Sequence, residues 1–145
     1  QEIGGGLFML SYAMLGAWGG TLMNVYGAIR CEILRHSKIA KSKWTLIFLL
    51  LLLTVICAAV LLLTAEKWYY LFFAAFAQYC GTFSMWSQNG KWIRWCQLLA
   101  VSPFWIVYNS IIPIPTIGGI LTEIFCIISV LIALFRYRKI GFTER

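Results

Sequence analysis

Charged residues are scarce in this chain of 145 residues: they make up 12% of the sequence, whereas 61% is hydrophobic and 17% aromatic. Soluble domains carry about twice that share of charge. A chain this short could not cover so much apolar surface in water, so the composition excludes an ordinary soluble domain. We expect lipid to be the solvent for most of the chain.

The residue sets that carry out chemistry are missing as well. The sequence has a single histidine, His36, and no serine–histidine–acid set, carboxylate pair or phosphate-binding glycine loop. Its 5 cysteines show no CxxC or other ligand spacing. We therefore expect no enzyme, no metal site and no cofactor.

The net charge of +7 could indicate binding to nucleic acid. However, the basic residues are confined to short loops between apolar runs, where the phosphates of lipid headgroups are the nearer anions. We expect no nucleic-acid partner.

The apolar runs predict six membrane-spanning helices, at residues 3–17, 20–34, 44–63, 68–86, 92–110 and 116–135. The third run is the plainest, because it carries no charge and spans about 30 Å, the thickness of a hydrocarbon core. The first run is short, and the chain opens on Gln1 in what reads as the middle of a helix, so we expect a helix to be missing upstream. Pro103 lies inside the fifth run, where we expect a kink.

The basic residues also predict the orientation. Of the 12 lysines and arginines, Lys67 alone falls on one side of the predicted membrane. The others lie in or beside the loops that follow the second, fourth and sixth runs. Such an excess marks the cytoplasmic side, so we predict a multi-pass plasma-membrane protein with a cytoplasmic C-terminus.

One apolar segment is partly repeated later in the chain. Residues 19–30 read GGTLMNVYGAIR, and residues 118–125 read GGILTEIF, with Asn24 and Glu123 in the same polar position. Both copies would run from outside to cytoplasm, which predicts a parallel repeat about an axis along the membrane normal. An acid at the centre of a membrane helix costs roughly 2.5–3.5 kcal/mol, so Glu123 should face protein or water.

Small residues recur along one face of the second run, and Gly16, Gly20 and Gly27 predict a helix-packing seam there. The seam either packs against another helix, with Asn24 making one interhelical hydrogen bond, or faces a cavity. Arg30 lies about 9 Å beyond Asn24 along the axis, and we expect its side chain to reach the headgroups.

If the seam faces a cavity, polar residues of several spans would supply its lining. Gln78 and Thr82 are four residues apart and share a helix face, and Asn109 closes the fifth run, where it could also cap the helix. The predicted substrate-binding set is Asn24, Glu123, Gln78, Thr82 and Asn109.

Several motifs together resemble the YgjV family of bacterial inner-membrane proteins. They are YAMLGA at 12–17, NVYGAIR at 24–30, Thr82-x-x-x-Trp86, WIVYN at 105–109 and Gly119-x-x-x-Glu123. The family is similar in plan to the SWEET, SemiSWEET and PQ-loop transporters, in which two triple-helix bundles surround a central cavity.

The resemblance implies an all-α polytopic protein of the bacterial inner membrane with three parts. Residues 1–43 would form an incomplete first bundle and a cytoplasmic loop, 44–67 a connector helix, and 68–145 the second bundle and a cytoplasmic tail. Asn24 and Glu123 would be the paired positions of the two third helices at the substrate site.

The function expected from these patterns is a small-molecule transporter or facilitator of unknown substrate, which Glu123 could link to protons. The alternative is a non-catalytic assembly or structural subunit, which would dock partner helices through the glycine seam in a homo-oligomer or on another membrane protein. Binding or moving lipid is a third interpretation, with weaker support from the basic loops.

Overall fold

The computed structural model describes residues 9–36, 41–63 and 67–140, with the backbone alone at 137–140. Every regular element in these residues is helical, which confirms the all-α prediction. The elements are α2 (Trp18–Arg35), α4 (Lys43–Leu63), α5 (Trp68–Trp86), α6 (Gly90–Cys96), the π-helical turn η1 (Gln97–Val101), α7 (Ser102–Ile111) and α8 (Ile117–Ile140).

The helices follow the predicted runs closely where a long apolar stretch is bounded by polar loops. The run at 68–86 has the bounds of α5, and the run at 44–63 begins one residue inside α4. The first run falls partly on residues 1–8, outside the described residues, and its remainder is helical at 9–14.

Gly16 differs from the seam prediction. It lies in the turn between 9–14 and α2 with a φ of +70°, and a Cβ added there would meet no atom within 4 Å. A left-handed backbone of this kind suits glycine, which has no side chain to strain. Gly16 therefore turns the chain, and it packs against none of the described helices.

The fifth run is interrupted by a π-helical turn, in addition to the kink expected at Pro103. The N–H of Ser102 bonds to the carbonyl of Gln97, five residues earlier, and Pro103 follows in the first turn of α7. Pro103 has no N–H to donate. It lies near the start of α7, just after the π-helical turn η1.

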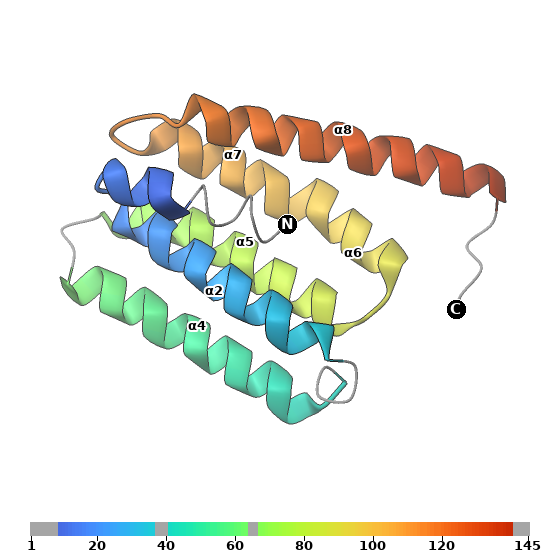
Figure 1. Cartoon of the computed structure of the whole chain (residues 1–145), viewed down its shortest axis with the longest axis horizontal. Helices are drawn as coiled ribbons and strands as arrows, with labels where there is room; N and C mark the ends of the chain where they lie inside the picture. The colour runs from blue at the N-terminus through green and yellow to red at the C-terminus, as the bar shows by residue number, and fades with distance from the viewer. Residues whose placement is uncertain (1–8, 37–40, 64–66, 141–145) are drawn as a thin grey trace.

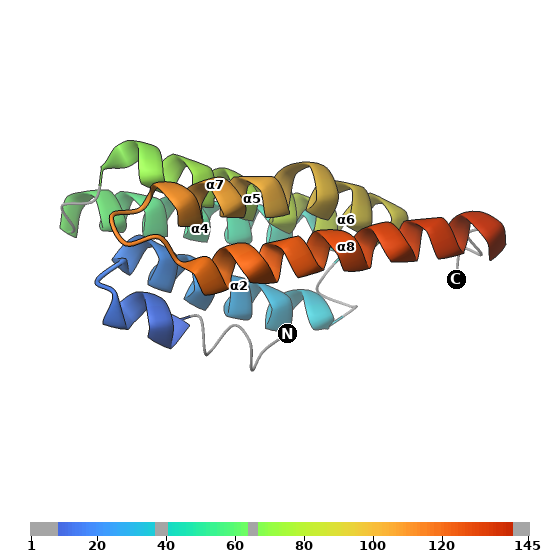
Figure 2. The ribbon, with the colours of Figure 1, turned by 90° about the horizontal axis from the view of Figure 1, so that it is seen from above.

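The long helices lie side by side, with α8 along one edge and α4 along the other (Figure 1). α5 packs against α2, α4 and α7, and α8 packs against α7 and η1. Seen from above, α2 lies beside the layer that contains α5 and α7 (Figure 2). The largest fully buried side chains include Tyr26, Met23 and Leu49 on the α2–α4 side and Tyr108 on α7.

The outer helices expose their apolar side chains. Two helices among the described residues are long and apolar enough to cross a membrane by length and composition: α4, and α8 over Ile117–Arg136. Only 17% and 6% of their most apolar windows are buried inside the protein. Apolar surface of this extent suits contact with lipid. The predicted number of six spans remains a prediction.

Candidate functional site

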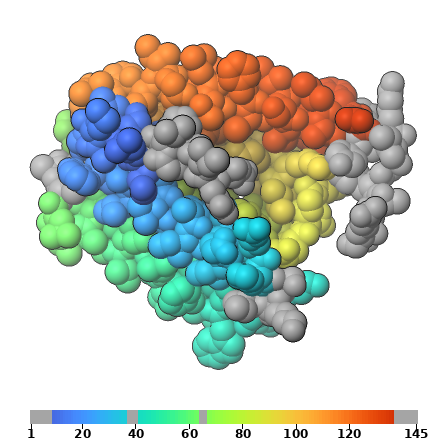
Figure 3. Space-filling model, in the orientation of Figure 1, coloured from blue at the N-terminus to red at the C-terminus, as the bar shows by residue number. Residues whose placement is uncertain are grey.

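A cavity of about 460 Å³ lies among α2, α5, η1, α7 and α8 and is lined by polar side chains from each of these elements. In the space-filling view, α2 and α8 flank a face on which α6 is visible between them (Figure 3). The polar residues that line the cavity are Tyr12, Asn24, Arg30, Gln78, Ser84, Gln97, Asn109, Thr122 and Glu123.

Arg30 belongs to the wall formed by α2 and α5. Its Nη1 donates to Oε1 of Gln78 at 2.7 Å, to the Gln78 carbonyl at 3.3 Å and to Oγ1 of Thr82 at 3.4 Å. Gly81 makes room for this arrangement, because a Cβ there would lie 2.9 Å from Nη1. The expectation that Arg30 reaches the headgroups is therefore wrong, since its guanidinium is held against α5.

Further hydrogen bonds fix this wall from behind. Nε2 of Gln78 donates to the Met23 carbonyl at 3.0 Å, which ties α5 to α2. The hydroxyls of Tyr26 and Thr82 are 2.8 Å apart, and Tyr26 also donates to the Leu49 carbonyl on α4 at 3.2 Å. Three helices thus meet in one buried network, which holds Gln78 rigidly beneath Arg30.

Asn24 contributes its amide to the same wall. Its Nδ2 donates to the Gly20 carbonyl of its own helix at 2.8 Å. The amide thus bonds back within α2, and it bonds to no other helix that the structure describes. Asn24 is half-buried and lines the cavity.

Glu123 enters the cavity from α8. Its Oε2 is buried and has no hydrogen-bond partner among the described residues. Ser102 on α7 lies beside the carboxyl group, and the Ser102 hydroxyl accepts a hydrogen bond from Nε2 of Gln97 at 2.8 Å. The Gln97 amide of η1 therefore holds the Ser102 hydroxyl of α7, which in turn orients the Glu123 carboxyl group.

Asn109 closes one end of the cavity. Its Oδ1 accepts hydrogen bonds from the hydroxyls of Tyr12 and Thr116, and its Nδ2 donates to the Trp105 carbonyl at 2.8 Å. The Thr116 N–H donates to the Asn109 carbonyl at 3.1 Å. One buried side chain thereby joins the 9–14 segment, α7 and the residue before α8.

Four of the five predicted substrate-binding residues meet at this cavity: Asn24, Gln78, Asn109 and Glu123 line it. Thr82 does not line it; it is fully buried behind Arg30 and supports the wall. In the seam, Gly20 packs closely on the ring of Tyr12 and the hydroxyl of Tyr108, and Gly27 faces Nε2 of Gln78.

Sequence reasoning missed Arg30 and Gln97 as cavity residues, and Ser102 as the buried hydroxyl beside Glu123. Arg30 stands near the end of an apolar run, where a basic side chain commonly extends to the surface. Gly81 could have indicated the space that Arg30 occupies, because a small residue leaves room for a neighbouring side chain. However, this contact joins α2 and α5, which are far apart in the sequence. Gln97 and Ser102 come together through the π-helical turn, which no periodic pattern announces.

A larger pocket lies elsewhere on the protein. It has a volume of about 820 Å³, and its lining comes from the 15–18 turn, Leu22, the end of α4, Lys67, Tyr70 and the loop at 112–114. None of the predicted substrate-binding residues lines it. Since its side chains are mostly apolar, the smaller cavity holds the more specific chemistry.

The described residues contain no group of three or more His, Cys, Asp or Glu side chains that could hold a metal ion. No curated protein and no solved structure matches the chain. The pattern of the Imp-YgjV family, described as a bacterial inner membrane protein, matches residues 5–140. The match covers nearly the whole chain and confirms the resemblance drawn from its motifs, so this protein belongs to the Imp-YgjV family of bacterial inner membrane proteins.

Proposed function

We propose that this protein is a small-molecule membrane transporter or facilitator whose solute occupies the cavity among α2, α5, α7 and α8. The observation that carries the proposal is that two ionisable side chains, Arg30 and Glu123, line one cavity from different helices. Ionisable groups at membrane depth are costly and mark solute or ion pathways when they face a cavity.

The size and the chemistry of the cavity support the same function. Small-molecule sites have volumes of about 300–1,000 Å³, and this cavity has about 460 Å³. Amides from four helical segments (Asn24, Gln78, Gln97 and Asn109) give it hydrogen-bonding groups that a lipid chain would not need.

The glycine seam gives less support to the alternative of an assembly subunit. Gly20 is covered by the ring of Tyr12 and the hydroxyl of Tyr108 of the same chain, and Gly27 has Gln78 as its neighbour. Such glycines allow close packing within the protein, so among the described residues these two glycines already have neighbours of the same chain.

The test is uptake of labelled sugars, amino acids and small organic acids into proteoliposomes that contain the purified protein. We expect at least one solute to enter faster than into protein-free liposomes, and Asn24→Ala and Glu123→Ala to reduce that uptake. Glu32→Ala is the matched control, because Glu32 is exposed on α2 outside the cavity. Equal uptake by the wild-type protein and by both cavity variants would contradict the proposal, as would no uptake above the protein-free level.

A further inference from the structure

One edge of the Arg30 guanidinium is committed to the protein. All three hydrogen bonds of the group come from Nη1, which donates to Gln78 and Thr82. Its Nε is buried without a hydrogen-bond partner in the part of the chain that the structure describes. Because Nε is buried, Nη2 is the guanidinium nitrogen that remains for a ligand.

Nη2 can bind a carboxylate. A hydrogen bond from a guanidinium nitrogen to a carboxylate is assisted by both charges and is about twice as strong as one between neutral groups. The neutral partners on Nη1 hold the group in place without neutralising its charge. Over the described residues, no carboxylate forms an ion pair with Arg30.

Glu123 presents the complementary charge in the same cavity. It lines the cavity with Arg30, yet the described ion pairs do not include it, and its Oε2 lacks a hydrogen-bond partner. Two opposite charges at membrane depth that do not contact each other are each costly. A ligand that carries one charge of each sign would neutralise both.

Building on the transporter function above, we propose that the solute is a small zwitterion of the amino-acid type. Its carboxylate binds Nη2 of Arg30, and its ammonium group binds the Glu123 carboxylate. A simple anion would leave Glu123 unpaired, a simple cation would leave Arg30 unpaired, and a neutral polyol would pair neither charge.

The first experiment uses wild-type protein in liposomes and a ¹⁴C-labelled mixture of L-amino acids with uncharged side chains. Unlabelled 2-hydroxy acids, which lack the ammonium group, and amino-acid amides, which lack the carboxylate, are the competitors. We expect uptake of the mixture, and competition about tenfold or more weaker from either analogue than from the unlabelled amino acids, because each analogue loses one charged contact.

The second experiment assigns the two charges to their residues. Arg30→Lys keeps the charge but loses the planar guanidinium, which can bond to α5 through Nη1 and to the solute through Nη2, and we expect uptake to fall about tenfold. Glu123→Gln has nearly the same shape, and we expect it to lose the preference for amino acids over 2-hydroxy acids. This change in preference is a readout that a merely destabilised protein would not give.

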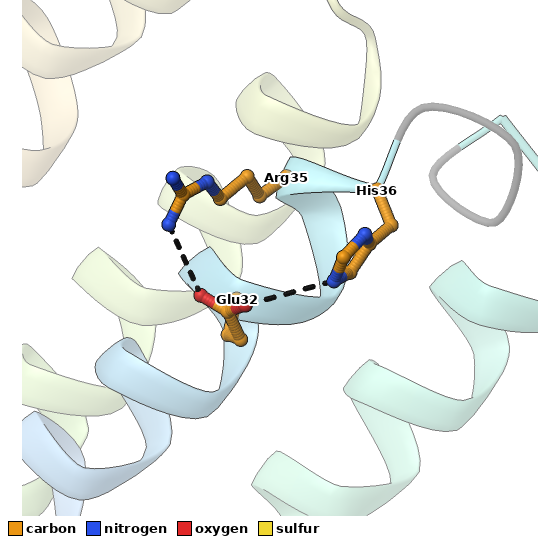
Figure 4. A network of polar contacts seen from close by, with 3 residues as sticks. All are labelled: Glu32, Arg35 and His36. Carbon is orange, nitrogen blue, oxygen red and sulfur yellow. Dashed lines mark ion pairs between the residues drawn. The ribbon is translucent and has the colours of Figure 1, made fainter.

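The controls come from an exposed ion pair at the end of α2, where Nη1 of Arg35 lies 3.7 Å from Oε2 of Glu32 (Figure 4). Arg35→Lys and Glu32→Gln repeat the two substitutions away from the cavity and should leave uptake and preference unchanged.

Two results would overturn the zwitterion proposal while leaving a transporter in place. One is uptake of a neutral sugar without uptake of amino acids, and the other is equal competition by amino acids and 2-hydroxy acids. A Glu123→Gln variant with unchanged preference would also overturn it. No uptake of any solute would overturn both this proposal and the transporter function.

Discussion

Single residues decide the chemistry of the cavity, and Arg30 is the plainest case. Its place near the end of α2 predicts a side chain that extends to the headgroups, yet its Nη1 lies 2.7 Å from Oε1 of Gln78. A long flexible side chain can fold along its own helix in either direction, and the choice depends on space in a neighbouring helix. Gly81 provides that space, and a single sequence does not reveal which helices will be neighbours.

Gly119 provides a test of close packing at the residue scale. A Cβ on Gly119 would lie 2.7 Å from Oδ1 and 2.8 Å from Cγ of Asn109. Asn109 is held by several hydrogen bonds and has little freedom to move aside. We expect Gly119→Ala to destabilise the protein by about 1–3 kcal/mol, seen as a lower melting temperature in detergent.

The neighbouring glycine is the matched control for this substitution. A Cβ on Gly118 would meet no atom within 4 Å, and alanine is the better helix former by about 1 kcal/mol. Gly118→Ala should therefore leave the melting temperature unchanged or raise it. Equal losses from both substitutions would show that the contact with Asn109 is not the cause.

At the scale of elements, the boundaries of the long helices follow from the sequence and the interruptions do not. The bounds of α5 could be predicted because an apolar, membrane-spanning run ends where polar residues begin. The turn η1 depends on a local choice between two hydrogen-bond patterns of similar energy beside Pro103. The same limit applies to Gly16, whose small size fits both a packing face and a turn.

The start of α6 allows a prediction at this scale. The side chain of Asn89 accepts hydrogen bonds from the N–H groups of Lys91 at 3.0 Å and Trp92 at 3.2 Å. Removing such a cap costs about 1 kcal/mol. We expect Asn89→Ala to lower the thermal stability by that amount in detergent, whereas Asn89→Asp, which retains an acceptor, should keep most of it. A fully stable Asn89→Ala variant would show that the cap contributes nothing.

At the scale of the whole molecule, the sequence indicates that lipid surrounds most of the chain and identifies the family. Four of the five predicted substrate-binding residues line the cavity. Asn24 and Glu123 could be found because polar residues are conspicuous in apolar helices. Their surroundings could not be found, since the wall behind Arg30 requires contacts among α2, α4 and α5. The six spans and the parallel repeat stay predictions.

The orientation in the membrane is testable in intact cells. In a chain without native cysteines, we expect an impermeant maleimide to label Ile114→Cys, in the loop before α8, from outside. Lys41→Cys, in the basic loop before α4, should react only after the membrane is permeabilised, because basic loops stay cytoplasmic. Both sites lie in exposed loops. The reverse pattern would show that the C-terminus faces outward.

The most direct test of the account asks whether water-soluble molecules reach the cavity in a membrane. Two native cysteines, Cys31 and Cys126, line the cavity, whereas Cys57 packs against the hydrophobic core. Each would be kept as the only cysteine in reconstituted protein and treated on both sides with a charged, membrane-impermeant thiosulfonate, with a membrane-permeable reagent as the reference. The account predicts that Cys31 and Cys126 react and that Cys57 does not; labelling of Cys31 and Cys126 as slow as that of Cys57 would contradict it.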